Sequence, residues 1–367
     1  MTATRTNSGN LRTRTAQSPT SLFPSFYDPS KASSWDYSPN HRELFKAAKS
    51  FREQHGIRAA GNDRFRNHLL LIDVQRDFCF PEGTLFVGGR SGPGAIDDSR
   101  RTAEFIYNNM GVITEITPTM DTHFPFQIFF PSFWNDENGN PLLPHDQIDG
   151  ELTIIRERKP AGKASVNPAV AGFIVNGNYN WIQAFAAHYC KSLADGGRYM
   201  LYIWPEHCMI GSVGHALVGV VDEARMFHAY VRNIQSTVEV KGGNPLTENY
   251  SVLAPEVLMR QDGETLASMN TRFLEKLMDA DRLIIAGQAA SHCVKSTIDH
   301  ILEHILTNDA TLAKKIYILR NCTSAVAVPD GKGGFFVDFT PQAEDALKRY
   351  AAAGMNIVDS TTPIANW

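Results

Sequence analysis

Residues 284–296 read IIAGQAASHCVKS, an apolar run followed by small residues and then by a cysteine that opens a helix. The run that begins at Leu283 predicts a buried parallel strand, which Gly287 ends. From position 294 to position 305, apolar residues recur at helical spacing. We therefore expect Cys293 in the first turn of a helix at the C-terminal end of a strand, where ligands bind in open α/β sheets.

This position gives Cys293 a distinctive chemical environment. Free N–H groups and the helix dipole at a helix N-terminus favour a thiolate over a thiol. The same N–H groups can stabilise an oxyanion. Taken by itself, however, Cys293 fits equally well as a small buried core residue.

Composition narrows the classes of protein that fit. Hydrophobic residues make up 43% of the 367, enough for a large core, and the formal charge of −4 gives no reason to expect nucleic acid or an anionic membrane as a partner. No apolar run has membrane-spanning length, and no charged-then-apolar start resembles a signal peptide. We expect a cytoplasmic protein that forms a homo-oligomer. Five scattered cysteines without CxxC spacing fit a reducing compartment. They are Cys79, Cys190, Cys208, Cys293 and Cys322.

From Asn67 onward, strand patterns alternate with helical patterns. This alternation predicts a doubly wound, three-layer α/β/α fold with a mainly parallel sheet. The expected strands are His68–Ile72, Val112–Met120, Tyr199–Trp204, Arg282–Ala286, Lys315–Leu319 and Met355–Val358. The expected helices lie near Ser99–Asn109, Ser212–Phe227, Thr265–Ala280, Cys293–Leu306 and Pro341–Ala353.

Two further parts precede or interrupt this α/β domain, which we place at 61–367. Residues 1–60 form an N-terminal extension, with a flexible tail to about residue 20 and a helix at His41–His55. An insertion at about 124–198 is far longer than an ordinary connection. We expect it to contain a strand at Leu152–Ile155 and a helix around Trp181–Ala194, and to lie near the rim of the active site.

A carboxylate follows the first predicted strand. Asp73 comes directly after the apolar run at 69–72, which places it at the C-terminal edge of the sheet and partly out of water. Desolvation raises the pKa of a carboxylate and suits it to proton transfer. The alternative is that Asp73 only caps the following turn, a common role of aspartate.

Possible metal ligands follow the next two predicted strands. Asp121 and His123 form an Asp-x-His pair, which places both side chains on the same side of an extended segment. His207 follows the predicted strand at 199–204. One carboxylate and two imidazoles with open positions for water suit Zn, Fe or Mn. A single histidine of this kind is more often a structural residue.

Lys241 follows a short alternating strand in the segment VEVKGG at 238–243. A lysine beside a cysteine favours the thiolate, and beside a carboxylate it keeps that group ionised. The alternative is an ordinary surface lysine. Together, Asp73, Lys241 and Cys293 make a base, a cation and a nucleophile of the kind expected for acyl transfer from an amide.

Five segments, in this order along the chain, resemble the isochorismatase-like cysteine hydrolases, and within them the nicotinamidase/pyrazinamidase group. They cover the chain from Asn67 to about Asp359, apart from the insertion. The segments are LIDVQRDFCFPEGTL at 71–85, MDTH at 120–123, WPEHCMIGSVGHAL at 204–217, VKGGNPLTENYSVL at 240–253 and IAGQAASHCVKSTIDH at 285–300.

The resemblance implies an isochorismatase-like hydrolase fold and a cysteine amidohydrolase. Cys293 would attack the carboxamide carbon and form a thioester, which water then hydrolyses. Asp73 would take the thiol proton and pass it to the departing ammonia, while Lys241 holds both groups in their charged states. The backbone N–H groups of Ala289 and Cys293 would form the oxyanion hole, and a cis peptide bond is expected at Gln288–Ala289.

The same resemblance implies a substrate ring held between aromatic side chains. In nicotinamidases, a metal binds the ring nitrogen of the substrate. The resemblance places Phe78, Trp204 and Tyr250 at the aromatic positions, and Asp121, His123 and His207 at the metal positions.

The chain departs from the family at the metal segment. There the Asp-x-His pair is usually followed by a second histidine, but residues 124–130 read FPFQIFF. Gln127 is the only polar side chain in that stretch, and His145 in the insertion is a less favoured substitute. The sequence therefore leaves open whether a divalent metal binds weakly or at all.

The leading interpretation is hydrolysis of nicotinamide to nicotinate and ammonia. A related cysteine hydrolase could act instead on another C–N bond, as in an N-carbamoyl compound, a biuret-like urea or a maleamate. A non-catalytic binding protein and a metal-only hydrolase with a structural Cys293 are further alternatives. Isochorismate ether hydrolysis is less favoured, because that branch of the family usually lacks the nucleophilic cysteine.

Overall fold

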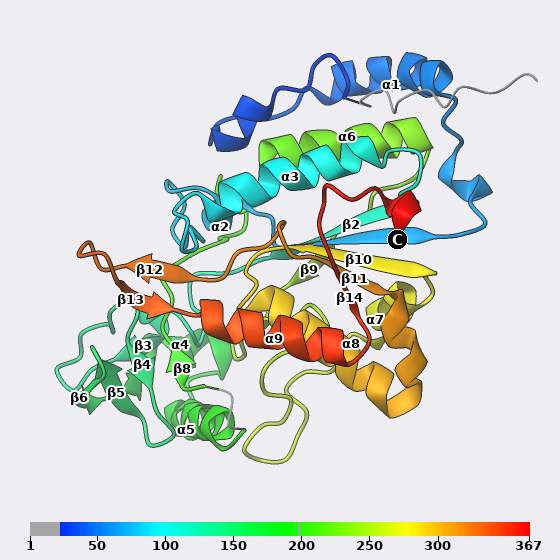
Figure 1. The fold of residues 1–367 in the computed structure, drawn as a ribbon. Coiled ribbons are helices and arrows are strands. Elements are labelled where there is room, and N and C mark those ends of the chain that lie inside the picture. The colour runs from blue at the N-terminus through cyan, green and yellow to red at the C-terminus, as the bar shows by residue number, and fades with distance from the viewer. Residues whose placement is uncertain (1–22, 197–198) are drawn as a thin grey trace, which may run out of the picture.

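The computed structural model describes residues 23–196 and 199–367, so the tail predicted to be flexible lies outside the described residues. A six-stranded sheet with the order β14-β11-β10-β1-β2-β9 lies at the centre, and every neighbouring pair in it is parallel (Figure 1). Its strands are β1 (Asn67–Ile72), β2 (Glu115–Asp121), β9 (Glu239–Lys241), β10 (Arg282–Gly287), β11 (Ile316–Leu319) and β14 (Asn356–Val358).

Helices cover both faces of this sheet, which confirms the predicted three-layer α/β/α architecture (Figure 1). Within the described residues, no helix is both long enough and apolar enough to cross a membrane. One face carries α3 (Gly94–Asn108) and α6 (Gly219–Arg232), and the other carries α7 (Thr271–Met278), α8 (Cys293–Asn308) and α9 (Thr340–Ala352).

Side chains of the central strands alternate between the two helical layers. On β1, Leu69 and Leu71 pack into the cluster that contains α3 and α6, whereas Leu70 and Ile72 pack into the cluster that contains α8. All four are fully buried. A strand buried on both faces has a continuous apolar sequence, and this explains why the run at 69–72 predicts it correctly.

The predicted strand at Tyr199–Trp204 is wrong as a member of the central sheet. Only β8 (Leu201–Tyr202) forms there, and it pairs antiparallel with β4 (Gln147–Ile148) of the insertion. The place beside β2 belongs to β9, a three-residue edge strand whose Val240 is 59% exposed. An apolar run indicates burial, but it does not say against which sheet the strand packs.

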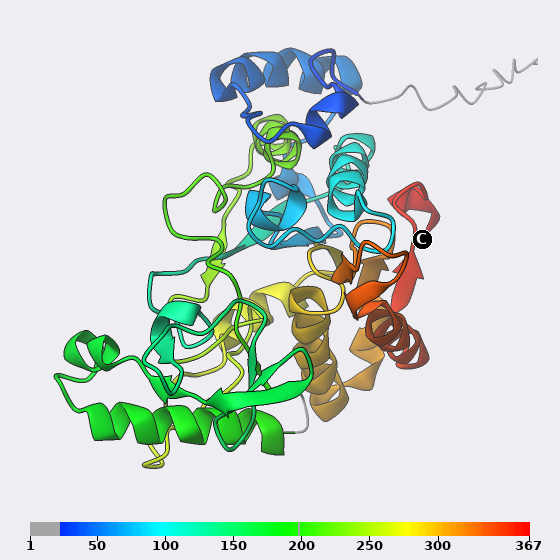
Figure 2. The ribbon, with the colours of Figure 1, turned by 90° about the vertical axis from the view of Figure 1, so that its left-hand side faces the viewer.

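The insertion forms its own lobe. Figure 2 shows it at the opposite end of the molecule from α1. Three of its strands form an antiparallel sheet with β8, in the order β6-β5-β4-β8, and its longest helix is α5 (Tyr179–Asp195), close to the predicted helix. The other insertion elements are β3 (Trp134–Asn135), β5 (Thr153–Arg156), β6 (Lys159–Lys163), β7 (Ser165–Val166) and α4 (Pro168–Ile174).

The N-terminal extension packs on α6 through aromatic rings. Its helix α1 (His41–His55) matches the predicted helix. Phe227 of α6 lies between two side chains of the extension, with its ring centroid 5.1 Å from that of Phe51 and 4.9 Å from that of Phe26.

The remaining elements of the described residues are short. They are α2 (Arg76–Cys79), the hairpin β12 (Ala327–Pro329) and β13 (Phe335–Asp338), and the 3-10 helices Pro29–Ser33, Ala60–Asn62, Pro131–Phe133, Ala310–Lys315 and Ile364–Asn366.

Helix α6 begins at Gly219, seven residues after the predicted start. The loop that precedes it is held on α2, since the backbone N–H groups of Arg76 and Asp77 donate to the carbonyls of Ala216 and Gly214. A Cβ on Gly214 would lie 2.1 Å from the Asp77 carboxylate, so only glycine allows this contact. The contact fixes the segment that follows His207.

His228 makes folding sensitive to acid. It is buried in α6, and its Nε2 lies 2.9 Å from the Ile113 carbonyl oxygen, to which it donates. Burial lowers its pKa from 6.5 to about 4. In the unfolded chain this imidazole binds a proton near pH 6.5, whereas in the folded chain it binds one only near pH 4. The free energy of unfolding therefore decreases as the pH falls through this window.

We expect His228→Gln to remove this loss, because glutamine keeps an N–H donor and does not titrate. The expected difference across the window is about 3 kcal/mol in the free energy of unfolding, measured by urea titration at a series of pH values. His41→Gln, at an exposed position, is the matched control. Parallel pH profiles for the wild-type and His228→Gln proteins would contradict the assignment.

Candidate active site

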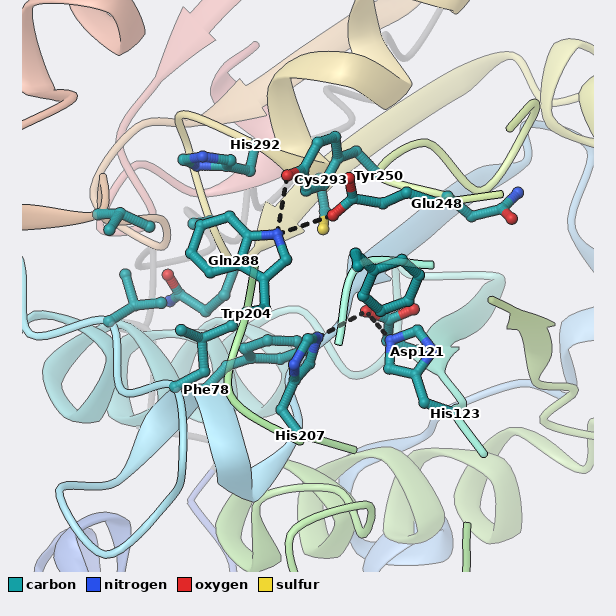
Figure 3. Close-up of a pocket in the computed structure, with 16 residues that line it drawn as sticks. Phe78, Asp121, His123, Trp204, His207, Glu248, Tyr250, Gln288, His292 and Cys293 are labelled. Carbon is teal, nitrogen blue, oxygen red and sulfur yellow. Dashed lines mark hydrogen bonds and ion pairs between the residues drawn. The ribbon is translucent and has the colours of Figure 1, made fainter. Parts of the chain in front are cut away.

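Four side chains meet at the C-terminal edge of the central sheet. Asp73 follows β1, Asp121 ends β2, Lys241 ends β9, and Cys293 opens α8 after β10. Asp121 and Lys241 are direct partners in the register between β2 and β9, so their side chains lie next to each other. Figure 3 shows the pocket that Asp121 and Cys293 border. The parallel fold thus brings together residues that are up to 220 positions apart in the sequence.

Lys241 is the centre of a buried charge cluster. Its Nζ lies 3.0 Å from Asp73 Oδ2, 2.9 Å from Asp121 Oδ1 and 3.8 Å from Cys293 Sγ. It also donates to the Asn249 carbonyl at 2.8 Å. The lysine side chain is only 2% exposed, which excludes the alternative of an ordinary surface lysine.

Asp73 does not cap a turn. Its carboxylate accepts a hydrogen bond from the Thr119 hydroxyl and pairs with Lys241, and it is fully buried. Burial raises its pKa, against the opposing effect of Lys241. A carboxylate with a raised pKa is a better proton acceptor than an exposed one.

The resting state of Cys293 differs from the thiolate that its helix position suggests. Burial raises the pKa of the Cys293 thiol well above its usual value, and Lys241 only partly offsets this effect. The neighbouring Asp73 carboxylate raises the pKa of the thiol further. For Lys241 the charged partners outweigh burial. Burial favours the neutral amine, but Asp121 and Asp73 together raise the pKa of Lys241 well above its usual value. The cluster therefore pairs a thiol with a carboxylate base beside a fixed ammonium group.

The start of α8 presents backbone donors to the pocket. The peptide bond between Gln288 and Ala289 is cis, which confirms that expectation. Neither the Ala289 N–H nor the Cys293 N–H donates a hydrogen bond to another described residue. Unused N–H groups beside a nucleophile are the usual components of an oxyanion hole.

Asp121, His123 and His207 form a compact buried group. His123 Nε2 lies 3.0 Å and His207 Nε2 3.7 Å from Asp121 Oδ2, and one ligand atom from each of the three lies within 4.8 Å of the others (Figure 3). His207 comes from the loop after β8, and not from a strand of the central sheet as predicted. Burial opposes ionisation of Asp121, but His123 and Lys241 hold its pKa well below the usual value.

The hydrogen bonds behind the two imidazoles favour a cation between them. Nδ1 of His123 faces the Gly242 carbonyl at 3.3 Å, and Nδ1 of His207 faces the Pro205 carbonyl at 2.8 Å. An imidazole that donates from Nδ1 has its lone pair on Nε2. Both lone pairs then point at the Asp121 carboxylate, so the three residues fit a divalent metal ion.

Gln127 and His145 do not complete this group. Gln127 donates to the Gly242 carbonyl at 2.8 Å and lies 3.3 Å from His123 Nδ1, on the side of the ring away from Asp121. His145 is exposed and contacts the Tyr202 hydroxyl in the insertion. Gln127 therefore binds the same Gly242 carbonyl that His123 faces, and it does not take the place of a fourth ligand.

The three predicted aromatic residues line the pocket together with a carboxyl group that sequence reasoning missed. Phe78, Trp204 and Tyr250 border the same cavity as Cys293, and so does Glu248 (Figure 3). The open space is only about 40 Å³, so an aromatic ring enters only if these side chains move apart. Nothing in the segment 244–250 marks Glu248 as a pocket residue, since it lies in a loop without strand or helix periodicity.

Sequence reasoning also missed Thr119, although the sequence contains a signal that places it near the site. It lies two positions before Asp121 on β2. Side chains at positions i and i+2 of a strand point to the same face, so Thr119 had to share the face of Asp121. Its hydroxyl reaches Asp73 because β1 and β2 are neighbours.

No family model matches the sequence, and no curated protein matches it. Among solved structures, the chain is similar to the yeast nicotinamidase Pnc1p bound to the inhibitor nicotinaldehyde, with 18% identity over 80% of this chain and 99% of that chain and a TM-score of 0.46. The pyrazinamidase of Pyrococcus horikoshii in complex with zinc has 17% identity over 80% of this chain and 99% of that chain, with a TM-score of 0.40. The Acinetobacter baumanii nicotinamidase/pyrazinamidase has 16% identity over 82% of this chain and 99% of that chain, with a TM-score of 0.44. Identities and scores this low do not transfer an activity, so what this chain does follows only from its own residues.

Proposed function

We propose that this protein is a cysteine amidohydrolase that converts a small aromatic carboxamide, with nicotinamide as the first candidate, into a carboxylate and ammonia. The observation that carries the proposal is the buried set of Asp73, Lys241 and Cys293, in which the Lys241 ammonium lies 3.0 Å from the Asp73 carboxylate and 3.8 Å from the Cys293 sulfur. A nucleophile, a base and an orienting cation in mutual contact are what acyl transfer requires. The aromatic walls of the pocket suit a flat ring.

The proposed reaction has two halves. Asp73 accepts the thiol proton as Cys293 Sγ attacks the carboxamide carbon, and negative charge develops on the carbonyl oxygen near the N–H groups of Ala289 and Cys293. Asp73 then gives the proton to the amide nitrogen as the C–N bond breaks and ammonia leaves. Water next attacks the thioester while Asp73 takes its proton, and the C–S bond breaks. Asp73 returns this proton to Cys293 Sγ, and the acid product leaves as its carboxylate. Lys241 holds Asp73 in place throughout.

Ammonia release from nicotinamide and from pyrazinamide tests the proposal. Wild-type protein should release ammonia, and Cys293→Ala should not. Release by Cys293→Ala at the wild-type rate would instead mean a metal-only hydrolase with a structural cysteine. No release from either amide would exclude these two substrates.

Asp121, His123 and His207 are the residues that would hold a divalent metal in this protein. A bound Zn, Fe or Mn ion would act there as a Lewis acid for a ring nitrogen or a water molecule. The role of the chain is to hold both imidazoles with their lone pairs directed at that point, through the carbonyls of Gly242 and Pro205.

Gly242→Ala should weaken zinc binding. Gly242 has φ +86°, and a Cβ there would lie 2.6 Å from His123 Cε1 and 2.7 Å from Asp121 Oδ1. We expect the zinc affinity, measured by calorimetry with the metal alone, to fall about 10- to 100-fold. Gly243→Ala is the matched control, since the nearest atom to its Cβ is 3.9 Å away. Equal affinities in the two variants would contradict the assignment of these ligands.

A second candidate is a related cysteine hydrolase that works without metal on another C–N bond, as in an N-carbamoyl compound, a biuret-like urea or a maleamate. Two observations favour it. Gln127 faces away from the metal position, so the metal group has three protein ligands among the described residues. A second cavity of about 590 Å³ adjoins the pocket across Trp204, Tyr250 and His292 and leaves space for a different substrate shape. Ammonia release from these compounds, but not from nicotinamide, in the presence of a chelator would select this candidate.

A further inference from the structure

A second cavity adjoins the catalytic pocket, and the proposed reaction does not use it. Its volume is about 590 Å³, whereas the open space beside Cys293 is about 40 Å³. Trp204, Tyr250 and His292 line both cavities and form the partition between them. In the view of Figure 3, Trp204 lies between His292 and His207. An occupant of the second cavity is therefore separated from the catalytic pocket by the thickness of one side chain.

The wall of the second cavity is aromatic where it meets the catalytic pocket. The ring centroid of His292 lies 5.7 Å from that of Trp204 and 5.4 Å from that of Tyr250, and both pairs meet edge to face. Phe339 extends this wall on the His292 side, at 4.9 Å. Tyr202 extends it on the Trp204 side, at 4.2 Å. Burial lowers the pKa of His292 to about 4, so its ring is neutral at pH 7. A wall of neutral rings favours a flat, uncharged group.

The insertion holds this wall in place. The Trp204 N–H donates to the Phe129 carbonyl of the insertion at 2.8 Å. Tyr202 pairs with Gln147 in the register between β8 and β4, and both side chains line the second cavity. A site held on paired strands keeps its shape before a ligand binds.

Helix α8 builds another wall. Lys295, Ser296 and Asp299 line the second cavity but not the catalytic pocket. Lys295 Nζ lies 2.8 Å from Asp299 Oδ2, so these two charges compensate each other. Glu303 also lines the cavity, but it is exposed, and water screens its charge. These groups therefore favour an uncharged occupant as well.

The position of Asp73 decides which part of a substrate reaches the second cavity. In the proposed reaction, Asp73 gives a proton to the amide nitrogen, and it is fully buried and lines neither cavity. A substituent on that nitrogen would meet packed protein. A substituent on the ring of the carboxamide can instead extend toward Trp204 and His292.

We propose that the second cavity is a subsite for a second, uncharged ring on the acyl part of the substrate. This inference rests on the proposed amidase function and narrows its substrate class to aromatic carboxamides that carry such a ring. The carboxamide carbon lies at Cys293, and the second ring passes His292 and stacks on the aromatic wall. Nicotinamide lacks this ring and loses its share of the binding free energy.

The kcat/KM values of nicotinamide and of its four isomeric phenyl derivatives, each with the phenyl group on a different ring carbon, test the inference. Wild-type protein should prefer at least one derivative by about 10- to 100-fold, the effect of burying a side chain of this size. Ser296→Phe puts a ring of the protein into the subsite and should bring this preference close to one. Thr307→Phe, at an exposed position of the same helix, is the matched control and should keep the preference.

Gln147→Phe fills the subsite from the insertion and should remove the preference as Ser296→Phe does. It decides the test if Ser296→Phe does not fold. The inference is overturned if wild-type protein prefers none of the four derivatives, or if the filling variants keep the wild-type preference.

Binding without turnover separates this inference from the proposed function. In Cys293→Ala, calorimetry should show tighter binding of at least one phenyl derivative than of nicotinamide, and adding Ser296→Phe should remove the difference. If wild-type protein hydrolyses none of these amides, the proposed function fails, and this binding difference alone decides whether the subsite exists. If nicotinamide is hydrolysed but no derivative binds more tightly than it does, the proposed function stands and the subsite is excluded.

Discussion

Asp73→Asn should lower kcat/KM for the amide substrate by a factor of about 10² to 10⁴, the range that a general base contributes. The asparagine amide cannot accept the Cys293 proton, and the thiol has a raised pKa because it is buried. The variant should nevertheless fold normally, since Lys241 keeps Asp121 as a partner at 2.9 Å. Steady-state kinetics gives the loss, and the rate of Cys293 alkylation by iodoacetamide should fall with it.

A matched control separates proton transfer from the positioning of Asp73. Thr119→Val removes the hydroxyl that hydrogen-bonds Asp73 Oδ1 but leaves the carboxylate in place. We expect a loss of about tenfold, equivalent to one ordinary hydrogen bond. In wild-type protein, kcat/KM should fall as the pH is lowered through the raised pKa of Asp73, because the protonated carboxyl is no longer a base. Wild-type activity in Asp73→Asn would show that another group takes the proton.

The central sheet was predictable where its strands are long and apolar. The strands β1, β10 and β11 lie close to their predicted bounds, since burial on both faces leaves a continuous apolar run in the sequence. The exchange of β8 for β9 was not predictable in this way. β9 has three residues, of which Val240 is exposed, and it owes its place to pairing with β2 rather than to its own pattern.

The candidate site was predictable as a set of residues, but not in its energetics. Asp73, Lys241 and Cys293 meet because parallel strands place their C-terminal ends at one edge. The directions of their pKa shifts follow from burial and from the charges around Lys241. The sequence shows the helix N-terminus and the lysine, but not how deeply these groups are buried. Glu248 depends on a loop that the insertion holds through Tyr189, a contact between segments that no local pattern records.

Lys241→Met should be the most destabilising of these substitutions. Methionine leaves the carboxylates of Asp73 and Asp121 buried without the ammonium that now lies 3.0 Å and 2.9 Å from them. Removing one partner of a buried ion pair costs about 3–5 kcal/mol in the free energy of unfolding. Activity should fall about 10²- to 10³-fold as well, the usual cost of losing a fixed electrostatic group beside the reacting atoms.

The pH dependence and a double variant test whether charge, rather than packing, is the cause. Without Lys241, the pKa of Asp73 in the folded state rises further above that of the unfolded chain. The folded state is then penalised once the pH exceeds the unfolded value of about 3.9, and the penalty shrinks in acid. Adding Asp73→Asn removes one of the two unpaired carboxylates, so the double variant should be more stable than Lys241→Met alone at pH 7. If the two losses in stability simply add, Lys241 contributes packing rather than charge compensation, and the buried cluster does not work as an electrostatic unit.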